Sequence, residues 1–111
     1  MELDIQTERD GDTCTVILEG EVDVYTAPRL KEELVTIIGD GCANVIVDME
    51  KVGFIDSSGL GVLVSALRRA RERGGVVRVV CSRDNILKIF RITGLDKVFP
   101  IFADRSEASR F

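Results

Sequence analysis

The sequence contains no histidine and no tryptophan. The absence of histidine excludes Ser-His-Asp and Cys-His triads, histidine general bases and histidine metal ligands. The three cysteines, Cys14, Cys42 and Cys81, are widely spaced and form no Cys-x-x-Cys pair, so they make no convincing zinc site. We therefore predict a protein that is not an enzyme and that carries no cofactor and no metal.

Aromatic side chains and positive charge are also scarce. The chain has one tyrosine and five phenylalanines, and its net charge is -4. Proteins that bind nucleic acids need a basic face and aromatic rings on which bases stack, so we expect no nucleic-acid partner. The one basic cluster consists of Arg68, Arg69, Arg71 and Arg73. It falls in the last turns of an expected helix, where cations complement the helix dipole, and it is interpreted as a solvated helix end or as a contact for an acidic partner.

No stretch of the chain is apolar enough to cross a membrane. The longest apolar stretch, residues 59–67, is far shorter than the roughly 20 residues that a bilayer requires. Glu2 and Asp4 interrupt the N-terminus, so no signal peptide is expected. Cys14 and Cys81 lie in apolar strand patterns and are interpreted as small buried side chains. Free thiols without an export signal predict a cytoplasmic protein that does not insert into membranes.

The pattern of apolar residues predicts one domain, residues 1–111, in which strands and helices alternate. Leu3, Ile5 and Thr7 alternate with polar residues as in a half-buried strand, and a turn at 10–11 leads to a second strand over 13–18. Strands are also expected over 44–49, 52–55, 76–80 and 98–102, and helices over 27–38, 60–71 and 84–93. Pro100 suggests that the last strand is an edge, and the tail 104–111 is expected to form a turn of helix or to fray.

This order predicts an α/β fold with a mixed, mostly parallel sheet of four to five strands packed with three to four helices. Strands that alternate with helices are joined by right-handed crossovers, which place them in parallel. The first two strands form a hairpin and are therefore antiparallel.

The most informative segment is Asp56-Ser57-Ser58-Gly59-Leu60-Gly61, between an expected strand and an expected helix. Such a junction presents hydroxyl groups at the positive end of a helix, where the first N–H groups have no partner within the helix. Ser57 is expected to be the N-cap, and the glycines would let the backbone of another molecule approach closely. We interpret the segment as a docking site for a partner protein, although an ordinary capped turn would have the same residues.

A phosphate on Ser57 would switch such a site. It adds roughly -1.5 to -2 charges at neutral pH, which a helix N-terminus tolerates. In a docked interface the same charge loses water, and an uncompensated buried ion costs on the order of several kcal/mol. Modification of Ser57 would therefore abolish binding without unfolding the domain.

Three segments of the sequence resemble bacterial anti-sigma factor antagonists of the STAS domain family. They are Gly-Glu-Val-Asp-Val-Tyr-Thr-Ala-Pro at 20–28, Phe-Ile-Asp-Ser-Ser-Gly-Leu-Gly-Val-Leu at 54–63 and Ile-Thr-Gly-Leu at 92–95. The resemblance implies that Ser57 is phosphorylated by the anti-sigma factor itself, a serine protein kinase that uses ATP. The unphosphorylated antagonist would bind that anti-sigma factor and release the sigma factor, and a PP2C-type phosphatase would restore it. The choice of Ser57 over Ser58 rests on the family pattern.

The expected docking surface combines the second of these segments with the loop of the first. Small side chains on the outer strip of the helix around residue 62 would form a flat landing surface. The residues expected to contact the partner are Asp23, Thr26, Asp56, Ser57, Ser58, Gly59, Gly61 and Val62.

The alternatives are less well supported. Asp48 ends a buried strand as a phosphoacceptor would, but the further acidic residues that hold magnesium are missing, so a solvated carboxylate is expected. A serine hydrolase needs glycine two positions before its serine, where Ser57 has Ile55. Within the fold, the alternative function is a STAS scaffold or regulatory subunit of a signalling or membrane-transport complex.

Overall fold

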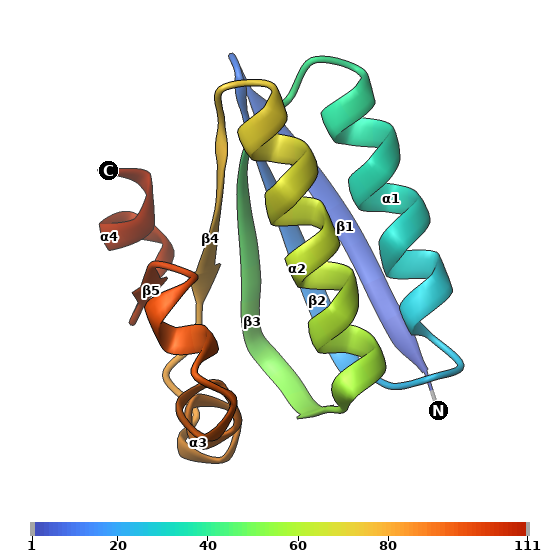
Figure 1. Ribbon diagram of the computed structural model, residues 1–111, viewed down its shortest axis with the longest axis vertical. Coiled ribbons are helices and arrows are strands. Elements are labelled where there is room, and N and C mark those ends of the chain that lie inside the picture. The colour runs from blue at the N-terminus through green and yellow to red at the C-terminus, as the bar shows by residue number, and fades with distance from the viewer. Residues whose placement is uncertain (1, 111) are drawn as a thin grey trace.

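The computed structural model describes residues 2–110, which form a sheet covered mainly on one face by helices (Figure 1). The strands are β1 (Leu3–Asp10), β2 (Thr13–Val22), β3 (Asn44–Ile55), β4 (Val76–Val80) and β5 (Ile101–Phe102). The helices are α1 (Ala27–Gly39), α2 (Ser57–Glu72), α3 (Asp84–Thr93), the short 3-10 helix η1 (Leu95–Lys97) and α4 (Arg105–Ser109).

The strands lie in the sheet in the order in which they occur in the chain, β1-β2-β3-β4-β5. Only β1 and β2 are antiparallel, and the other neighbours are parallel. Successive right-handed crossovers in one direction place their helices on the same face of a sheet, and Figure 1 shows α1 and α2 side by side there. The predicted mixed α/β architecture is confirmed.

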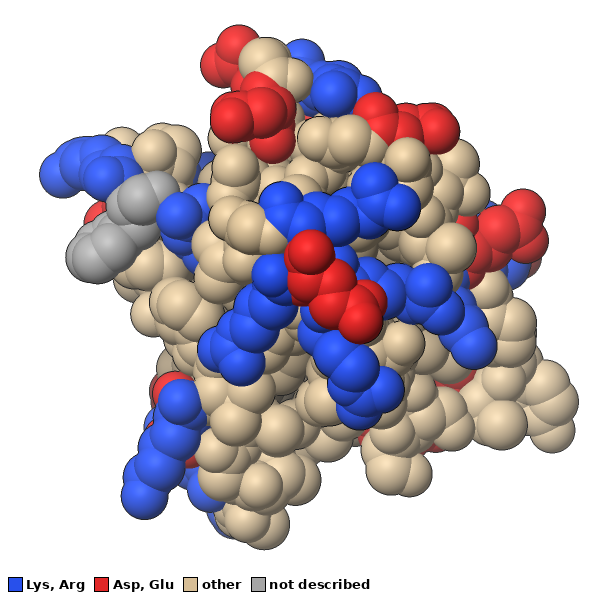
Figure 2. Space-filling view, turned by 45° about the horizontal axis from the view of Figure 1, so that its top comes forward, with Lys and Arg blue, Asp and Glu red and all other residues tan. Residues whose placement is uncertain are grey.

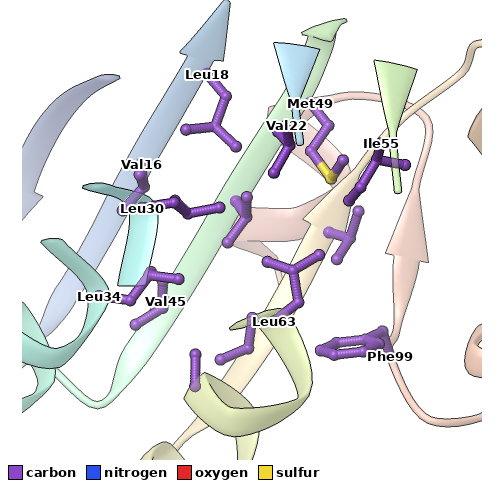
Figure 3. Packing of buried hydrophobic residues seen from close by; sticks show 14 of the residues in the cluster. Val16, Leu18, Val22, Leu30, Leu34, Val45, Met49, Ile55, Leu63 and Phe99 are labelled. Carbon is purple, nitrogen blue, oxygen red and sulfur yellow. The ribbon is translucent and has the colours of Figure 1, made fainter. Parts of the chain in front are cut away.

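The core lies between this sheet and the two long helices (Figure 3). Helix α1 contributes Leu30 and Leu34, and α2 contributes Leu63, all of which have almost no exposed surface. They pack against alternating side chains of β2 and β3, such as Val16 and Val45. Burial of one such side chain stabilises the fold by roughly 1.5–3 kcal/mol, so this apolar layer fixes the position of α2 on the sheet.

Strand β3 is longer than the sequence pattern suggested. The expected strands at 44–49 and 52–55 form one strand of twelve residues, Asn44–Ile55, and Lys51 is exposed within it. The pairing with β2 shifts register between Ile17 and Glu19 and again between Gly20 and Glu21. These irregularities let the two strands stay paired to their ends, so that β3 leads directly into α2.

The second face of the sheet is covered in part by the C-terminal helix α4. Ala108 packs there against Ile46 and Val80. Asp48 was expected to be solvated, but it is buried, and its Oδ2 lies 3.2 Å from Nε of Arg105 on α4. The tail therefore forms a short helix anchored by an ion pair, and the predicted edge position of the last strand, β5, is confirmed. Phe111, the last residue of the tail, lies outside the described residues.

The expectation of three free thiols is wrong for two of the cysteines. Cys14 on β2 and Cys42 in the α1–β3 connection form a disulfide, and both are buried. Cys81 is free and buried, as expected for a small core residue. The two cysteines are 28 positions apart in the sequence, and their pairing could not be predicted because it depends on the fold of β2 and α1, which returns the chain to the start of β2.

Reduction of the disulfide is expected to lower the free energy of unfolding by about 3 kcal/mol, because the cross-link restricts a loop of intermediate length in the unfolded chain. Guanidinium unfolding with and without a phosphine reductant measures this difference. The Cys14→Ala/Cys42→Ala double variant is the control, and its stability should not respond to reductant. If alkylation in denaturant without reductant labels all three cysteines, the cross-link is absent and the assignment is wrong.

Candidate functional site

The N-terminus of α2 is capped by Asp56 and not, as expected, by Ser57. Asp56 has extended backbone angles, and its Oδ1 accepts hydrogen bonds from the N–H groups of Ser58 at 2.9 Å and Gly59 at 3.2 Å. A carboxylate is favoured in this role because its charge complements the positive end of the helix dipole. Ser57 is therefore the first residue of the helix, and its hydroxyl is not needed to cap it.

The two serines at this helix end differ in exposure. Ser57 is exposed, and its hydroxyl group forms no hydrogen bond with any residue between 2 and 110. Ser58 lies one position further into the helix and is half-buried. An incoming phosphoryl donor can therefore approach Ser57 more freely than Ser58.

The two glycines have different surroundings. Gly59 is buried, and a Cβ there would collide with the side chains of Val22 and Ile55, so this glycine serves close packing of α2 on the sheet. The sequence had suggested that Gly59 lets a partner approach closely, and its burial gives it a packing role instead. Gly61 is exposed with open space around it, as a landing surface requires. Val62 is half-buried against the core, so it contributes only part of its side chain to the outer strip.

Asp23 and Thr26 hold the β2–α1 loop in shape. Asp23 has 9% and Thr26 has 3% of its surface exposed. Asp23 Oδ1 accepts hydrogen bonds from the N–H groups of Tyr25 at 2.9 Å and Thr26 at 3.0 Å. The Thr26 hydroxyl donates to the carbonyl of Glu21 at 2.8 Å and accepts from the N–H of Asp23 at 2.9 Å. Oδ1 of Asp23 and the hydroxyl of Thr26 are thus engaged within the loop, which fixes the position of the residues between them.

The hydrogen bonds of this loop also change the acidity of Asp23. Burial alone would raise the pKa of its carboxyl group, but the N–H groups of Thr26 and Tyr25 and the Thr26 hydroxyl outweigh this effect and lower the pKa below 3.8. Because the folded state has the lower pKa, the carboxylate stabilises the loop at neutral pH. That contribution is lost as the pH falls from the ordinary value through the lowered one.

Large apolar side chains are exposed on this loop and at the end of the neighbouring strand β3. Tyr25 has 82% and Val24 has 59% of its surface exposed, and Phe54 at the end of β3 is also exposed. Our sequence prediction did not include these three side chains among the contact residues. A signal was present for Val24 and Tyr25, since they lie in a connection beside polar residues that cap or hold the loop, where the hydrophobic core cannot use them. No such signal marked Phe54, which lies within β3.

The fold brings the loop and the start of α2 together at one end of the molecule. Glu21 pairs with Phe54 across the sheet, and the N–H of Asp56 donates to the carbonyl of Val22 at 3.1 Å. Figure 1 shows the β2–α1 loop, the end of β3 and the start of α2 at its lower end, with α3 beside them. We call Val24, Tyr25, Phe54, Ser57 and Gly61 the docking patch.

Other kinds of site find little support in the part of the chain that the structure describes. Between residues 2 and 110, no cluster of acidic residues or cysteines has the arrangement needed to hold a metal ion. None of the helices in this range combines the length and the apolar character needed to span a membrane. The docking patch therefore remains the most distinctive feature of the surface at this end.

Comparison with known proteins points to one family. The STAS domain model matches residues 4–108. The chain is 31% identical over 103 residues to the anti-sigma-B factor antagonist of Bacillus subtilis, with 93% of this chain and 94% of that protein covered.

Solved structures agree with this result. An anti-sigma factor antagonist from Mycobacterium paratuberculosis superposes with a TM-score of 0.90 at 26% identity, covering 98% of this chain and 92% of that one. The Bacillus cell fate determinant SpoIIAA in its phosphorylated form has the same fold, with a TM-score of 0.76 at 24% identity and coverage of 96% and 97%. The chain belongs to the STAS domain family, in the group of anti-sigma factor antagonists.

Proposed function

We propose that this protein binds an anti-sigma factor that is also a serine kinase, and that phosphorylation of Ser57 ends this binding. The observation that carries the proposal is the Ser57 hydroxyl, which is exposed and unbonded at the start of α2 within the docking patch. In the unphosphorylated state the protein holds the anti-sigma factor, so that the sigma factor is free. We place this exchange in the cytoplasm because it uses ATP and frees a sigma factor, although the Cys14–Cys42 disulfide is of a kind uncommon in that compartment. We assign it to a single domain of residues 1–111.

The capping of α2 by Asp56 supports the switch. The carboxylate already accepts from the N–H groups of Ser58 and Gly59, so these donors are not available to a phosphate on Ser57. The phosphate therefore extends into solvent over the docking patch, beside a carboxylate that repels it. In the free protein it stays hydrated at low cost, but a bound partner would have to remove that water.

The modification itself is a phosphoryl transfer from ATP. The Ser57 oxygen attacks the γ-phosphorus, the bond to the β-phosphate oxygen breaks, and ADP leaves. The serine proton passes to a base on the kinase, because the Asp56 carboxylate is engaged in capping. Hydrolysis of the phosphoserine by a PP2C-type phosphatase regenerates the binding form.

Tyr25 is the side chain best placed to anchor the partner. Large aromatic residues dominate the binding energy of many interfaces, and this ring is the most exposed apolar side chain of the docking patch. The loop that presents it is held by Asp23 and Thr26, so little conformational entropy is lost when it docks.

Replacement of Ser57 should separate the two states of the switch. Ser57→Ala is expected to bind the cognate anti-sigma factor irrespective of ATP, whereas Ser57→Asp is expected to bind at least about tenfold more weakly, because it places a charge in the interface. Isothermal titration with the purified kinase measures both affinities. Mass spectrometry after incubation with ATP should locate a single phosphate on residue 57.

The matched control for this experiment is Ser58→Ala, which should still be phosphorylated and released. Equal affinities of the alanine and aspartate variants would contradict the switch. A phosphate found on Ser58 would contradict the site, and no phosphate at all would favour a scaffold or regulatory role.

Replacement of Tyr25 should affect binding without affecting folding. Tyr25→Ala is expected to weaken the complex by about tenfold or more, while its thermal midpoint stays within about 2 °C of the wild type, since an exposed side chain adds little to stability. Tyr25→Phe keeps the ring and should bind nearly as well. Unchanged affinity of Tyr25→Ala would remove Tyr25 from the interface.

Replacement of Thr26 should affect folding. Thr26→Ala should lower the free energy of unfolding by about 1–3 kcal/mol, because it removes a buried hydroxyl that holds the loop.

A further inference from the structure

The opposite end of α2 carries a cluster of unpaired positive charges. Arg68, Arg69, Arg71 and Arg73 are all exposed, and within residues 2–110 none of their guanidinium groups forms a hydrogen bond or an ion pair. Figure 2 shows Lys and Arg side chains gathered on the face where the top of Figure 1, with the end of α2, comes forward. The chain as a whole has a net charge of -4, so its overall composition does not account for four unpaired arginines at one place on the surface.

Two grooves run along this end of α2, one on each side. The larger, of about 410 Å³, lies on the side of η1, and Arg68 and Arg71 border an apolar floor of Val64, Leu67 and Val98. The smaller, of about 220 Å³, lies between α2 and α1 and is bordered by Arg69 and Arg73. Glu72 lines both grooves. The arrangement joins a hydrophobic floor to a basic rim.

We infer that the larger groove and the arginines around it bind an acidic, amphipathic segment of a partner protein. Aliphatic side chains of that segment would lie on Val64, Leu67 and Val98, and its carboxylates would pair with Arg68 and Arg71. Guanidinium groups are suited to this role because they bind carboxylates in a bidentate manner and are weakly hydrated. The inference is independent of the proposed phosphorylation switch.

The floor and the overall charge favour a protein segment over other anionic partners. A single-stranded nucleic acid would need aromatic rings for stacking, but the exposed aromatic side chains described, Tyr25 and Phe54, lie at the other end of the molecule. An anionic membrane is an extended surface that would also face the acidic side chains around the arginines, whereas a short acidic segment would meet mainly the arginines within a Debye length of it. A segment that carries both aliphatic side chains and carboxylates can cover the apolar floor and pair with the arginines.

The groove is electrically separate from the docking patch. Arg71 follows Ser57 by fourteen helical residues, which corresponds to about 21 Å along α2. This exceeds the Debye length of about 8 Å at physiological ionic strength, so a phosphate on Ser57 has little effect on binding at the groove. One helix thus carries two surfaces that can be tested separately.

The test uses the full chain, labelled with ¹⁵N, and a short peptide of glutamates with leucines at helical spacing as the probe. Saturable shifts are expected for the backbone amides from Val64 to Arg73, at the end of α2, and for Val98. Arg68→Gln/Arg71→Gln should weaken binding by about fivefold or more, because it removes the paired charges. Lys31→Gln/Lys51→Gln, which changes the net charge equally at exposed positions elsewhere, should weaken it by less than about twofold.

Further arms separate this inference from its alternatives. A peptide with the leucines replaced by serines should bind more weakly, because it leaves the floor uncovered. Ser57→Asp should bind the acidic peptide as the wild type does, whatever its effect on the anti-sigma factor. The inference is overturned if the peptide gives no saturable shifts at these amides, or if the two double variants lose affinity equally. It is also overturned if a single-stranded oligonucleotide or phosphatidylserine vesicles bind there more tightly than the peptide.

Discussion

The carboxylate of Asp56 closes the N-terminus of α2, and the chemistry of the site depends on this cap. Oδ1 takes the two N–H groups that the helix leaves unpaired at Ser58 and Gly59. Because a charged acceptor already caps the helix, the neighbouring hydroxyl of Ser57 is not needed for capping. A side chain that is free of structural work can be modified without a loss of stability. The site is thus a helix end that Asp56 caps, which leaves the hydroxyl of Ser57 exposed and available for the modification proposed above.

The topology then decides what surrounds that hydroxyl. Because the strands follow one another in order across the sheet, the helices α1 and α2 share a face, and the ends of β2 and β3 lie side by side. Ligands of open parallel sheets bind beyond the carboxyl ends of the strands, where the connecting loops converge. Here the convergence brings the β2–α1 loop, which carries Tyr25, and the end of β3, which carries Phe54, to the same end of the molecule as the start of α2. Buried hydrogen bonds of Asp23 and Thr26 make the loop rigid enough to form a surface.

Much of this could be predicted from the sequence because local patterns determine it. The apolar stripe of α2, the hairpin turn after β1 and the edge character of the last strand, which Pro100 indicated, all depend on neighbouring residues. That strand was expected over 98–102, but it comprises only Ile101–Phe102. The choice of Asp56 over Ser57 as the cap could not be predicted, because both residue types cap helices well and only the backbone angles decide between them. The Cys14–Cys42 disulfide and the burial of Gly59 depend on contacts between distant segments, and they could not be predicted for that reason.

The two ends of α2 differ in a way that follows from the helix itself. The dipole favours anions at the start and cations at the end, and the chain has Asp56 at the first and four arginines at the second. A dipole is fully complemented by about half a unit charge, so one or two arginines would suffice for stability. The remaining positive charge lies beside an apolar groove and has no partner within the described chain. Helix electrostatics therefore accounts for the sign of the charge at this end but not for its amount, and the excess is what a partner of opposite charge would use.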